Sequence, residues 1–150
     1  MTGECGNQIN RGTTASVVFR GAEALLNYIA ACYEKDGNVD ATADKYWRAL
    51  RTRAKVNPDY NATIAATDVS KEAMGDFGAY SRGKMVDATL YNIRRERRNE
   101  LIGEGMRMAD LKRWRALDQV NNYHIEGMLY WGSSYEGKLL SQSGEDLVIV

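Results

Sequence analysis

One segment constrains the fold of this chain more than any other. It covers residues 92–114 and reads NIRRERRNELIGEGMRMADLKRW. On a helical wheel at ~100° per residue, a helix over 84–102 places its apolar side chains on one face. These side chains are Val86, Leu90, Ile93 and Leu101. Arg97 falls in the middle of that face and Glu104 falls almost over Val86. Burying either charge unpaired would destabilise the fold by several kcal/mol.

Two arrangements resolve this conflict. Either the helix kinks at Gly103 and Glu104 reaches solvent, or the charges meet partners inside the protein. Partners follow at intervals of three residues: Glu100 after Arg97, Arg107 after Glu104, and Asp110 after Arg107. Gly103 and Gly105 would let the next helix fold back over this one. We favour an inward-facing ion network that stabilises the fold.

Two other interpretations of the same helix stay open, namely an ordinary solvated face and a phosphate-binding surface. The wheel directs Arg94, Arg95 and Arg98 away from the apolar face. A phosphate-binding surface is the weakest interpretation, because four acids are interleaved with the basic residues. These acids are Glu96, Glu100, Glu104 and Asp110.

The rest of the chain predicts a mainly α fold with tetratricopeptide-like helix pairs and irregular loops. Apolar residues recur at helical spacing over 18–33 and 43–53, and the short link between these segments favours an antiparallel pair. Phe19, Leu26, Trp47 and Leu50 are the expected core positions. Asp40 or Thr42 is the expected N-cap and Gly37 the expected helix end. We expect a loop over 57–83, with a helical turn after Ser70, then helices over 84–102 and 106–117. A short β segment is expected near the C-terminus, at LVIV.

Composition narrows the possible functions. The 150 residues suit one domain, and 20 basic side chains balance 20 acidic ones. A dedicated nucleic-acid-binding protein usually has a clear basic excess. No apolar run approaches the roughly 18–20 residues of a membrane span. Cys5, Cys32 and the single His124 give no metal-binding spacing and no catalytic pairing, so we expect neither a metal nor a cofactor.

The arginine-rich segment resembles the signature of the SusD/RagB family, approximately I-R-x-E-R-x-x-E-L-x-x-E-G-x-R-x-x-D-L-x-R-W. The matching residues are Ile93, Arg94, Glu96, Arg97, Glu100, Leu101, Glu104, Gly105, Arg107, Asp110, Leu111, Arg113 and Trp114. FRGAEALLNYIAACYE, which begins at Phe19, and LRTRAKV, which begins at Leu50, are similar to two further family motifs. Ala31, Lys55, Met106 and Met108 depart from the family pattern.

The resemblance implies a non-enzymatic glycan-binding lipoprotein on the outer face of the outer membrane of Bacteroidota. Such a protein passes oligosaccharides to a partner TonB-dependent (SusC-like) transporter and binds no nucleic acid. We expect residues 1–150 to be one piece, the C-terminal part of a SusD/RagB-like domain truncated at both ends. Membrane attachment would then require a lipid anchor outside this sequence. The signature residues Arg94, Glu96, Arg97, Glu100, Glu104, Arg107, Asp110 and Trp114 would hold the fold without touching sugar.

The ligand residues stay open. Tyr130, Trp131 and Tyr135 combine aromatic faces with hydrogen-bonding groups, which suits a pyranose, although packing in a core or against a missing upstream half is the favoured explanation. An alternative function is a helical module that binds acidic partners or nucleic acid through Arg94–Arg98. A third is a glycosidase that uses Glu96 and Glu100 as paired carboxylates. Acids four residues apart on an arginine-rich helix are far more often ion-paired, so we expect no catalytic residues.

Overall fold

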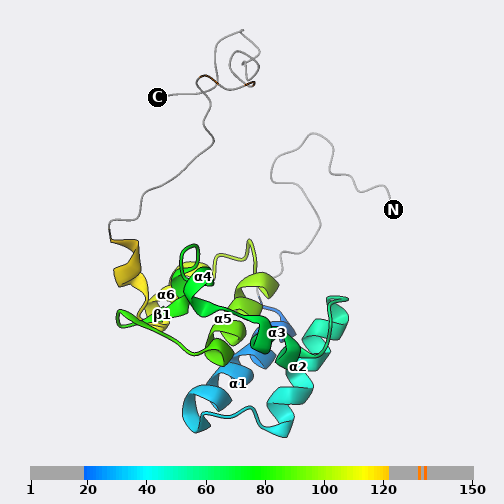
Figure 1. Cartoon of the computed structure of the whole chain (residues 1–150). Helices are drawn as coiled ribbons and strands as arrows, with labels where there is room; N and C mark the ends of the chain where they lie inside the picture. Colours follow the sequence, from blue (N-terminus) through cyan, green and yellow to red (C-terminus); the bar gives the residue numbers. More distant parts are fainter. Residues whose placement is uncertain (1–18, 122–131, 133, 135–150) are drawn as a thin grey trace.

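The computed structural model describes residues 19–121, 132 and 134, and this part of the chain is mainly helical, as predicted (Figure 1). The elements, in chain order, are α1 (Gly21–Asp36), α2 (Ala41–Arg53), α3 (Tyr60–Ala66), α4 (Val69–Glu72), the 3-10 helix η1 (Phe77–Ala79), β1 (Tyr80–Ser81), β2 (Lys84–Met85), α5 (Ala88–Glu100), α6 (Arg107–Arg113) and the 3-10 helix η2 (Leu117–Val120).

Helices α1 and α2 form the expected antiparallel pair (Figure 1), and the end of α1 and the start of α2 have the expected caps. Gly37 ends α1 in the left-handed conformation, with φ 66°, and its N–H donates to the Tyr33 carbonyl. Asp40 begins α2, since its side chain accepts a hydrogen bond of 2.7 Å from the Ala43 N–H. The link between the helices therefore contains only residues 37–40, which brings the helices side by side.

The main core lies where α5 packs against α1 and α3. Leu26, Trp47 and Leu50 are buried, as predicted. The Trp47 ring stacks on the Tyr60 ring, with centroids 4.1 Å apart and the planes nearly parallel. The fully buried side chains of greatest volume are Trp47, Tyr91, Leu26, Ile29 and Ile93. The core thus combines residues from both helices of the first pair with residues of α3 and α5.

Three expectations were wrong in detail. Phe19 is 84% exposed, because α1 begins at Gly21 and Phe19 precedes the helix whose face it was expected to share. Val86 likewise precedes α5, which begins at Ala88. The expected loop over 57–83 contains α3, which begins after the N-cap Asp59. Seven residues are too few for a clear apolar period, and α3 is held instead by Tyr60 packing on Trp47.

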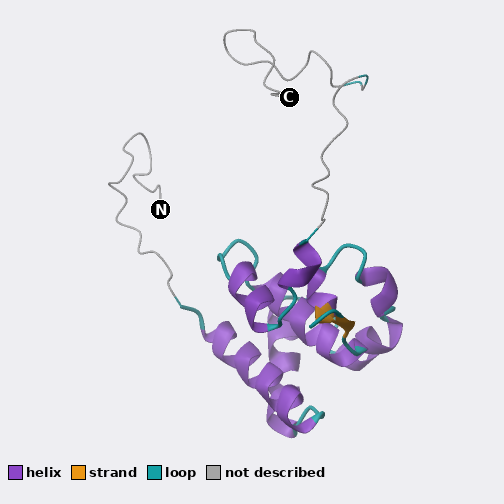
Figure 2. Ribbon diagram, turned by 90° about the vertical axis from the view of Figure 1, so that its left-hand side faces the viewer, coloured by secondary structure: helices purple, strands orange, loops and turns teal. Residues whose placement is uncertain are grey.

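A second, smaller core surrounds Trp114, together with Leu111, Ala116, Phe77 and Leu117. Beside it lies an antiparallel two-stranded sheet (orange in Figure 2), with Tyr80 opposite Met85 and Ser81 opposite Lys84. The β segment predicted at LVIV lies outside the described residues. Among the residues that the structure describes, no helix is both long enough and apolar enough to cross a membrane.

Candidate functional site

Arg97 is buried, 5% exposed, and is paired with a carboxylate of its own segment, as predicted. Its Nε lies 2.8 Å from both carboxylate oxygens of Asp110. Its Nη1 donates to the Asn27 side-chain oxygen at 2.8 Å, and Glu23 lies 3.7 Å from its Nη2. Arg97 therefore joins α5 to α6 and to α1. The inward-facing ion pair that we favoured over a solvated face is present.

The turn between α5 and α6 makes this pair possible. Gly103 and Gly105 have φ values of 78° and 74°, which side chains other than glycine rarely adopt. The backbone turns there, so that α6 brings Asp110 against Arg97. Glycine at these two positions is therefore part of how the ion pair is built.

The partners of the other signature acids are not the ones expected from sequence spacing. Glu100 accepts hydrogen bonds from Arg20 (2.9 Å) and from Arg53, and not from Arg97. Glu104 also pairs with Arg20, at 3.1 Å, and not with Arg107. Spacing of three residues identifies neighbours on one continuous helix only, and α5 ends at Glu100, so Glu104 and Arg107 no longer share its geometry.

Glu96 completes the link to the first helix pair. It accepts hydrogen bonds from the Trp47 indole N–H at 3.0 Å and from Arg51 Nη1 at 2.8 Å. Arg51 and Arg53 belong to the motif that begins at Leu50, and Arg20 belongs to the motif that begins at Phe19. The three sequence motifs are thus adjacent in space and are joined by ion pairs. Sequence reasoning missed these arginines as partners, although their place in the motifs was a usable signal.

Asp76 is a buried acid that sequence reasoning did not single out. Its two oxygens accept hydrogen bonds from Arg98 and Arg107, and one of them also accepts the Gly78 N–H at 2.9 Å. Burial by itself would raise the pKa of the Asp76 carboxyl. The hydrogen bonds from Gly78 and Arg107 outweigh burial, so the pKa lies below its ordinary value.

Arg94 is also buried, 5% exposed, which the helical wheel did not predict. The wheel considered one face, whereas α5 is covered by α1 on one side and by η1 on another. Arg94 donates to the carbonyls of Gly78 (3.0 Å) and Tyr80 (2.9 Å) and to the Ser81 hydroxyl (2.8 Å). Burial lowers the pKa of its guanidinium to about 10. No carboxylate in the described part of the chain forms an ion pair with it.

Trp114 lies among three guanidinium groups. Arg94, Arg107 and Arg113 approach its ring with their Cζ atoms 4.9, 5.8 and 5.7 Å from the ring centroid. The ring is buried, so its faces are not offered to a ligand. Trp114 therefore serves as packing for the arginines around it.

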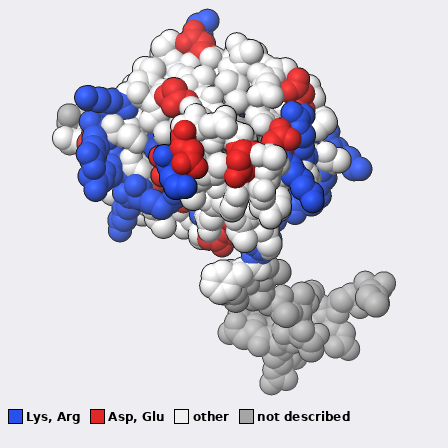
Figure 3. Space-filling model, turned by 90° about the horizontal axis from the view of Figure 1, so that it is seen from below, with Lys and Arg blue, Asp and Glu red and all other residues white. Residues whose placement is uncertain are grey.

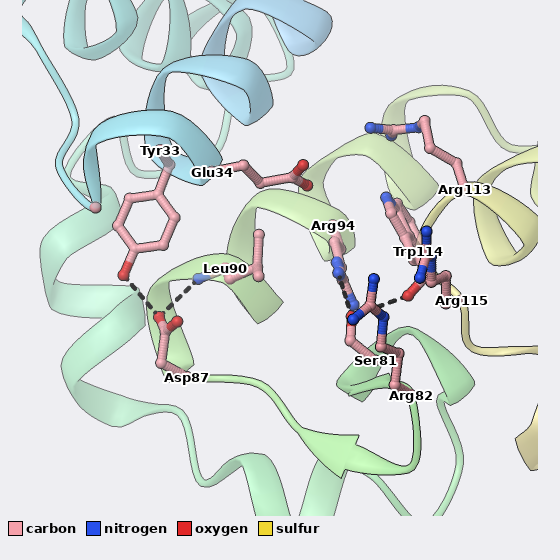
Figure 4. Close-up of a pocket in the computed structure, with 11 residues that line it drawn as sticks. Tyr33, Glu34, Ser81, Arg82, Asp87, Leu90, Arg94, Arg113, Trp114 and Arg115 are labelled. Atoms are coloured by element: carbon pink, nitrogen blue, oxygen red, sulfur yellow. Dashed lines mark hydrogen bonds between the residues drawn. The ribbon is translucent and has the colours of Figure 1, made fainter.

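A pocket of about 510 Å³ opens beside Arg94 and Trp114 (Figure 4). The end of α1, the β1–β2 hairpin, the start of α5 and the end of α6 contribute its walls. We call it the arginine pocket. Its lining residues are Tyr33, Glu34, Gly37, Ser81, Arg82, Asp87, Leu90, Arg94, Arg113, Trp114 and Arg115.

The remaining candidates give no site in the described residues. Tyr130, Trp131 and Tyr135, like Cys5 and His124, lie outside the part of the chain that the structure describes. Cys32 is half-buried and donates its S–H to the Asn38 carbonyl at 3.4 Å. A search of the described residues found no group of three or more His, Cys, Asp or Glu that could hold a metal ion.

The surface charges of the described residues are mixed. On the face shown in Figure 3, acidic side chains lie over the middle, at the top and on the upper right, and basic ones gather on the left and right. Arg95 and Arg98 are paired with Glu72 and Asp76. Arg94 and Arg97 are buried. The arginines of α5 are therefore engaged within the protein and do not form a free basic stripe.

Comparison with known proteins gives one match. The family model described as the SusD family matches residues 4–142. A search of curated proteins and a search of solved structures each found no significant match to the chain. The matched range includes all three motifs, whose charged residues meet in the network described above. The chain belongs to the SusD family, whose members bind glycans and other nutrients during uptake.

Proposed function

We propose that this protein binds an oligosaccharide at the outer face of the outer membrane and delivers it to a TonB-dependent transporter. The observation that carries the proposal is the family match over residues 4–142. The internal pairing of the signature residues supports it further. In the described part of the chain these residues hold helices together, which is the role expected of a scaffold that presents a binding surface elsewhere.

The proposal assigns the signature residues a structural role. Arg97 and Asp110 are each about 95% buried, so a ligand cannot reach their charged groups without unfolding the contact. Glu96 and Glu100 are each paired with arginines. For Glu100, burial raises the pKa, but the hydrogen bonds from Arg53 and Arg20 outweigh it and lower the pKa. A glycosidase acid needs a raised pKa to stay protonated, so this pairing does not suit catalysis.

Sugar contact is assigned to aromatic residues of the segment that follows the helices. Tyr130, Trp131 and Tyr135 offer the flat apolar faces and polar tips that a pyranose ring requires. The test is binding of a panel of oligosaccharides to the full 150-residue chain, followed by isothermal titration with any that bind. Trp131→Ala should raise the dissociation constant of the best ligand by about tenfold or more. A tenfold change corresponds to about 1.4 kcal/mol of binding free energy.

Tyr28→Ala is the matched control, because Tyr28 is an exposed tyrosine on α1, far along the chain from the proposed segment. The affinity of this variant for the same ligand should stay within about twofold of the wild-type affinity. Absence of binding across a broad panel of neutral and acidic glycans would contradict the proposal. Partner recognition is tested separately, by co-purification of the chain with TonB-dependent transporters of the organism that encodes it.

Binding of acidic partners or nucleic acid through Arg94–Arg98 is the competing function. It predicts an affinity for duplex DNA that falls steeply as salt is raised, because counterions are released on binding. We expect no binding at low salt, since the arginines of α5 are buried or paired and the chain has no net charge. Salt-sensitive binding that is lost in Arg95→Gln would favour the competing function.

A further inference from the structure

We infer that the arginine pocket binds the anionic group of an acidic glycan, either a carboxylate or a sulfate ester. This inference rests on the proposed function and adds to it the chemical class of the ligand. The arginines that pair with Glu96 and Glu100 do not line this pocket, so it is separate from those ion pairs.

The distribution of unpaired arginines is the first observation. Nine of the twelve arginines in the described part of the chain form an ion pair with a carboxylate there. The other three are Arg82, Arg94 and Arg115, and all three line the arginine pocket. Unpaired cations gathered in one pocket repel one another, and this repulsion is relieved when an anion binds between them.

The local balance of charge is the second observation. Four arginines line the pocket, and the acids that line it are Glu34 and Asp87. Asp87 is already engaged, because one of its oxygens accepts the Tyr33 hydroxyl at 2.8 Å and also the N–H groups of Thr89 and Leu90. Figure 4 shows this group at one end of the pocket and the arginines at the other. Glu34 attracts Arg94 electrostatically, but it is one acid beside four arginines, so the arginine end keeps a positive charge.

The backbone that holds Arg82 and Arg115 is the third observation. Both residues are in the left-handed conformation, with φ values of 50° and 54°, which side chains other than glycine and asparagine disfavour. The Arg82 N–H donates to the Arg115 carbonyl at 2.9 Å, so the two residues are held next to each other. Disfavoured backbone of this kind often occurs at binding sites.

The chemistry of the pocket fits an acidic sugar. Guanidinium groups bind carboxylates and similar oxyanions through two parallel hydrogen bonds. A volume of about 510 Å³ lies within the usual range of small-molecule sites. Glu34 forms no ion pair in the described part of the chain, so its carboxylate can accept hydrogen bonds from sugar hydroxyls. Arg94 stays fixed beneath the pocket by its bonds to the Gly78 and Tyr80 carbonyls and supplies charge.

The test uses two matched series of short oligosaccharides, one of galactose and one of glucose. Each series has a neutral member, a member with a carboxylate at C6 and a member with a sulfate ester at C6. Titration of the full chain should show at least one anionic member binding about tenfold or more tightly than its neutral parent. The two anionic members distinguish the carboxylate from the sulfate as the recognised group.

Arg82→Asn/Arg115→Asn removes the two exposed charges and places a residue that tolerates the left-handed conformation at both positions. This variant should keep the melting behaviour of the wild type and lose the preference for the anionic member. The control is Lys84→Gln/Lys112→Gln, which removes the same charge from exposed positions close along the chain that do not line the pocket. The control should keep the preference within about twofold.

Equal binding of anionic and neutral members, unchanged in the arginine variant, would overturn this inference and leave the proposed function intact. An equal loss in the lysine control would also overturn it, because it would show a general charge effect. If no member of either series or of the broader panel binds, both the inference and the proposed function fail.

Discussion

Arg97 and Asp110 are both buried, and each satisfies hydrogen-bonding groups of the other. A buried charge in the middle of an apolar helix face needs a partner, so the sequence predicted a carboxylate of this segment beside Arg97, and the structure shows that this carboxylate is Asp110. The partner is found on α6 and further contacts come from α1. Removal of one member leaves the other as an unpaired charge in the interior.

Arg97→Met should therefore destabilise the protein by about 3–5 kcal/mol, because it leaves Asp110 buried without its cation. Urea unfolding measures this difference. The exposed Lys45→Met serves as the control and should change stability by about 0.5 kcal/mol or less. Arg95, which points away from the apolar face, is a poorer control because it pairs with Glu72 and packs on Tyr91. Equal stability of the two variants would show that Arg97 is not a structural residue.

Asp76 makes stability depend on acid pH. Its pKa in the folded protein lies below its ordinary value of 3.8, so the carboxylate stabilises the fold above about pH 4. This contribution is lost as the pH falls through the lower folded-state pKa. Asp76→Asn should lower the free energy of unfolding by about 3 kcal/mol at pH 7. The difference in this free energy between the variant and the wild type should become smaller toward pH 2.

The urea midpoints of the wild type and of Asp76→Asn, measured at pH 7 and at low pH, show whether the difference in stability becomes smaller. The variant should keep some acid sensitivity, since hydrogen bonds from Arg53 and Arg20 also lower the pKa of Glu100. If the difference in stability between the wild type and Asp76→Asn is the same at every pH, the arginine contacts do not lower the pKa of Asp76.

Helix α5 is the element that joins the others. Glu96 and Glu100 contact side chains of α2. Arg97 contacts α1 and α6. Arg94 contacts η1 and β1. Successive residues on one helix point in different directions, so one charged helix reaches neighbours on several sides. The element is held by specific polar contacts as well as by apolar packing.

The second core depends on close packing at Gly78 of η1. A Cβ atom added to Gly78 would lie 3.3 Å from Trp114 Cζ3 and 3.1 Å from an Asp76 oxygen. Gly78→Ala should therefore destabilise the protein by about 1–3 kcal/mol through overpacking. The matched control is Gly75→Ala, where an added Cβ meets nothing within 4 Å and which should be nearly neutral. Thermal melting of both variants gives the comparison, and equal melting temperatures would show that η1 can shift without cost.

At the scale of the whole molecule, large apolar side chains remain on the surface. Phe19, Met74 and Ile102 are all exposed by 80% or more. Exposed apolar area favours association between molecules. We expect the chain to self-associate as its concentration rises, and Phe19→Gln/Ile102→Gln to weaken this association. Sedimentation velocity over a range of concentrations tests both. A monodisperse, cooperatively melting monomer at every concentration would contradict the expectation.

The sequence by itself determined the helical class, the first helix pair with its caps, and the need for a buried partner of Arg97. Each depends on local spacing, since helical periodicity, the N-cap Asp40 and the terminal Gly37 act within one or two turns of the chain. The family motifs could also be recognised from local order alone. Tyr130, Trp131 and Tyr135 remain sequence predictions, because they lie outside the described residues.

Only the tertiary structure decided which charges meet. Arg20 lies 80 residues from Glu100 along the chain and contacts it directly, and Asp76 receives arginines from both α5 and α6. The burial of Arg94 depends on elements that approach α5 from a second side. The arginine pocket likewise joins parts of four separate segments. Such contacts depend on how the helices pack, because interactions distant in sequence leave no periodic pattern in the local sequence.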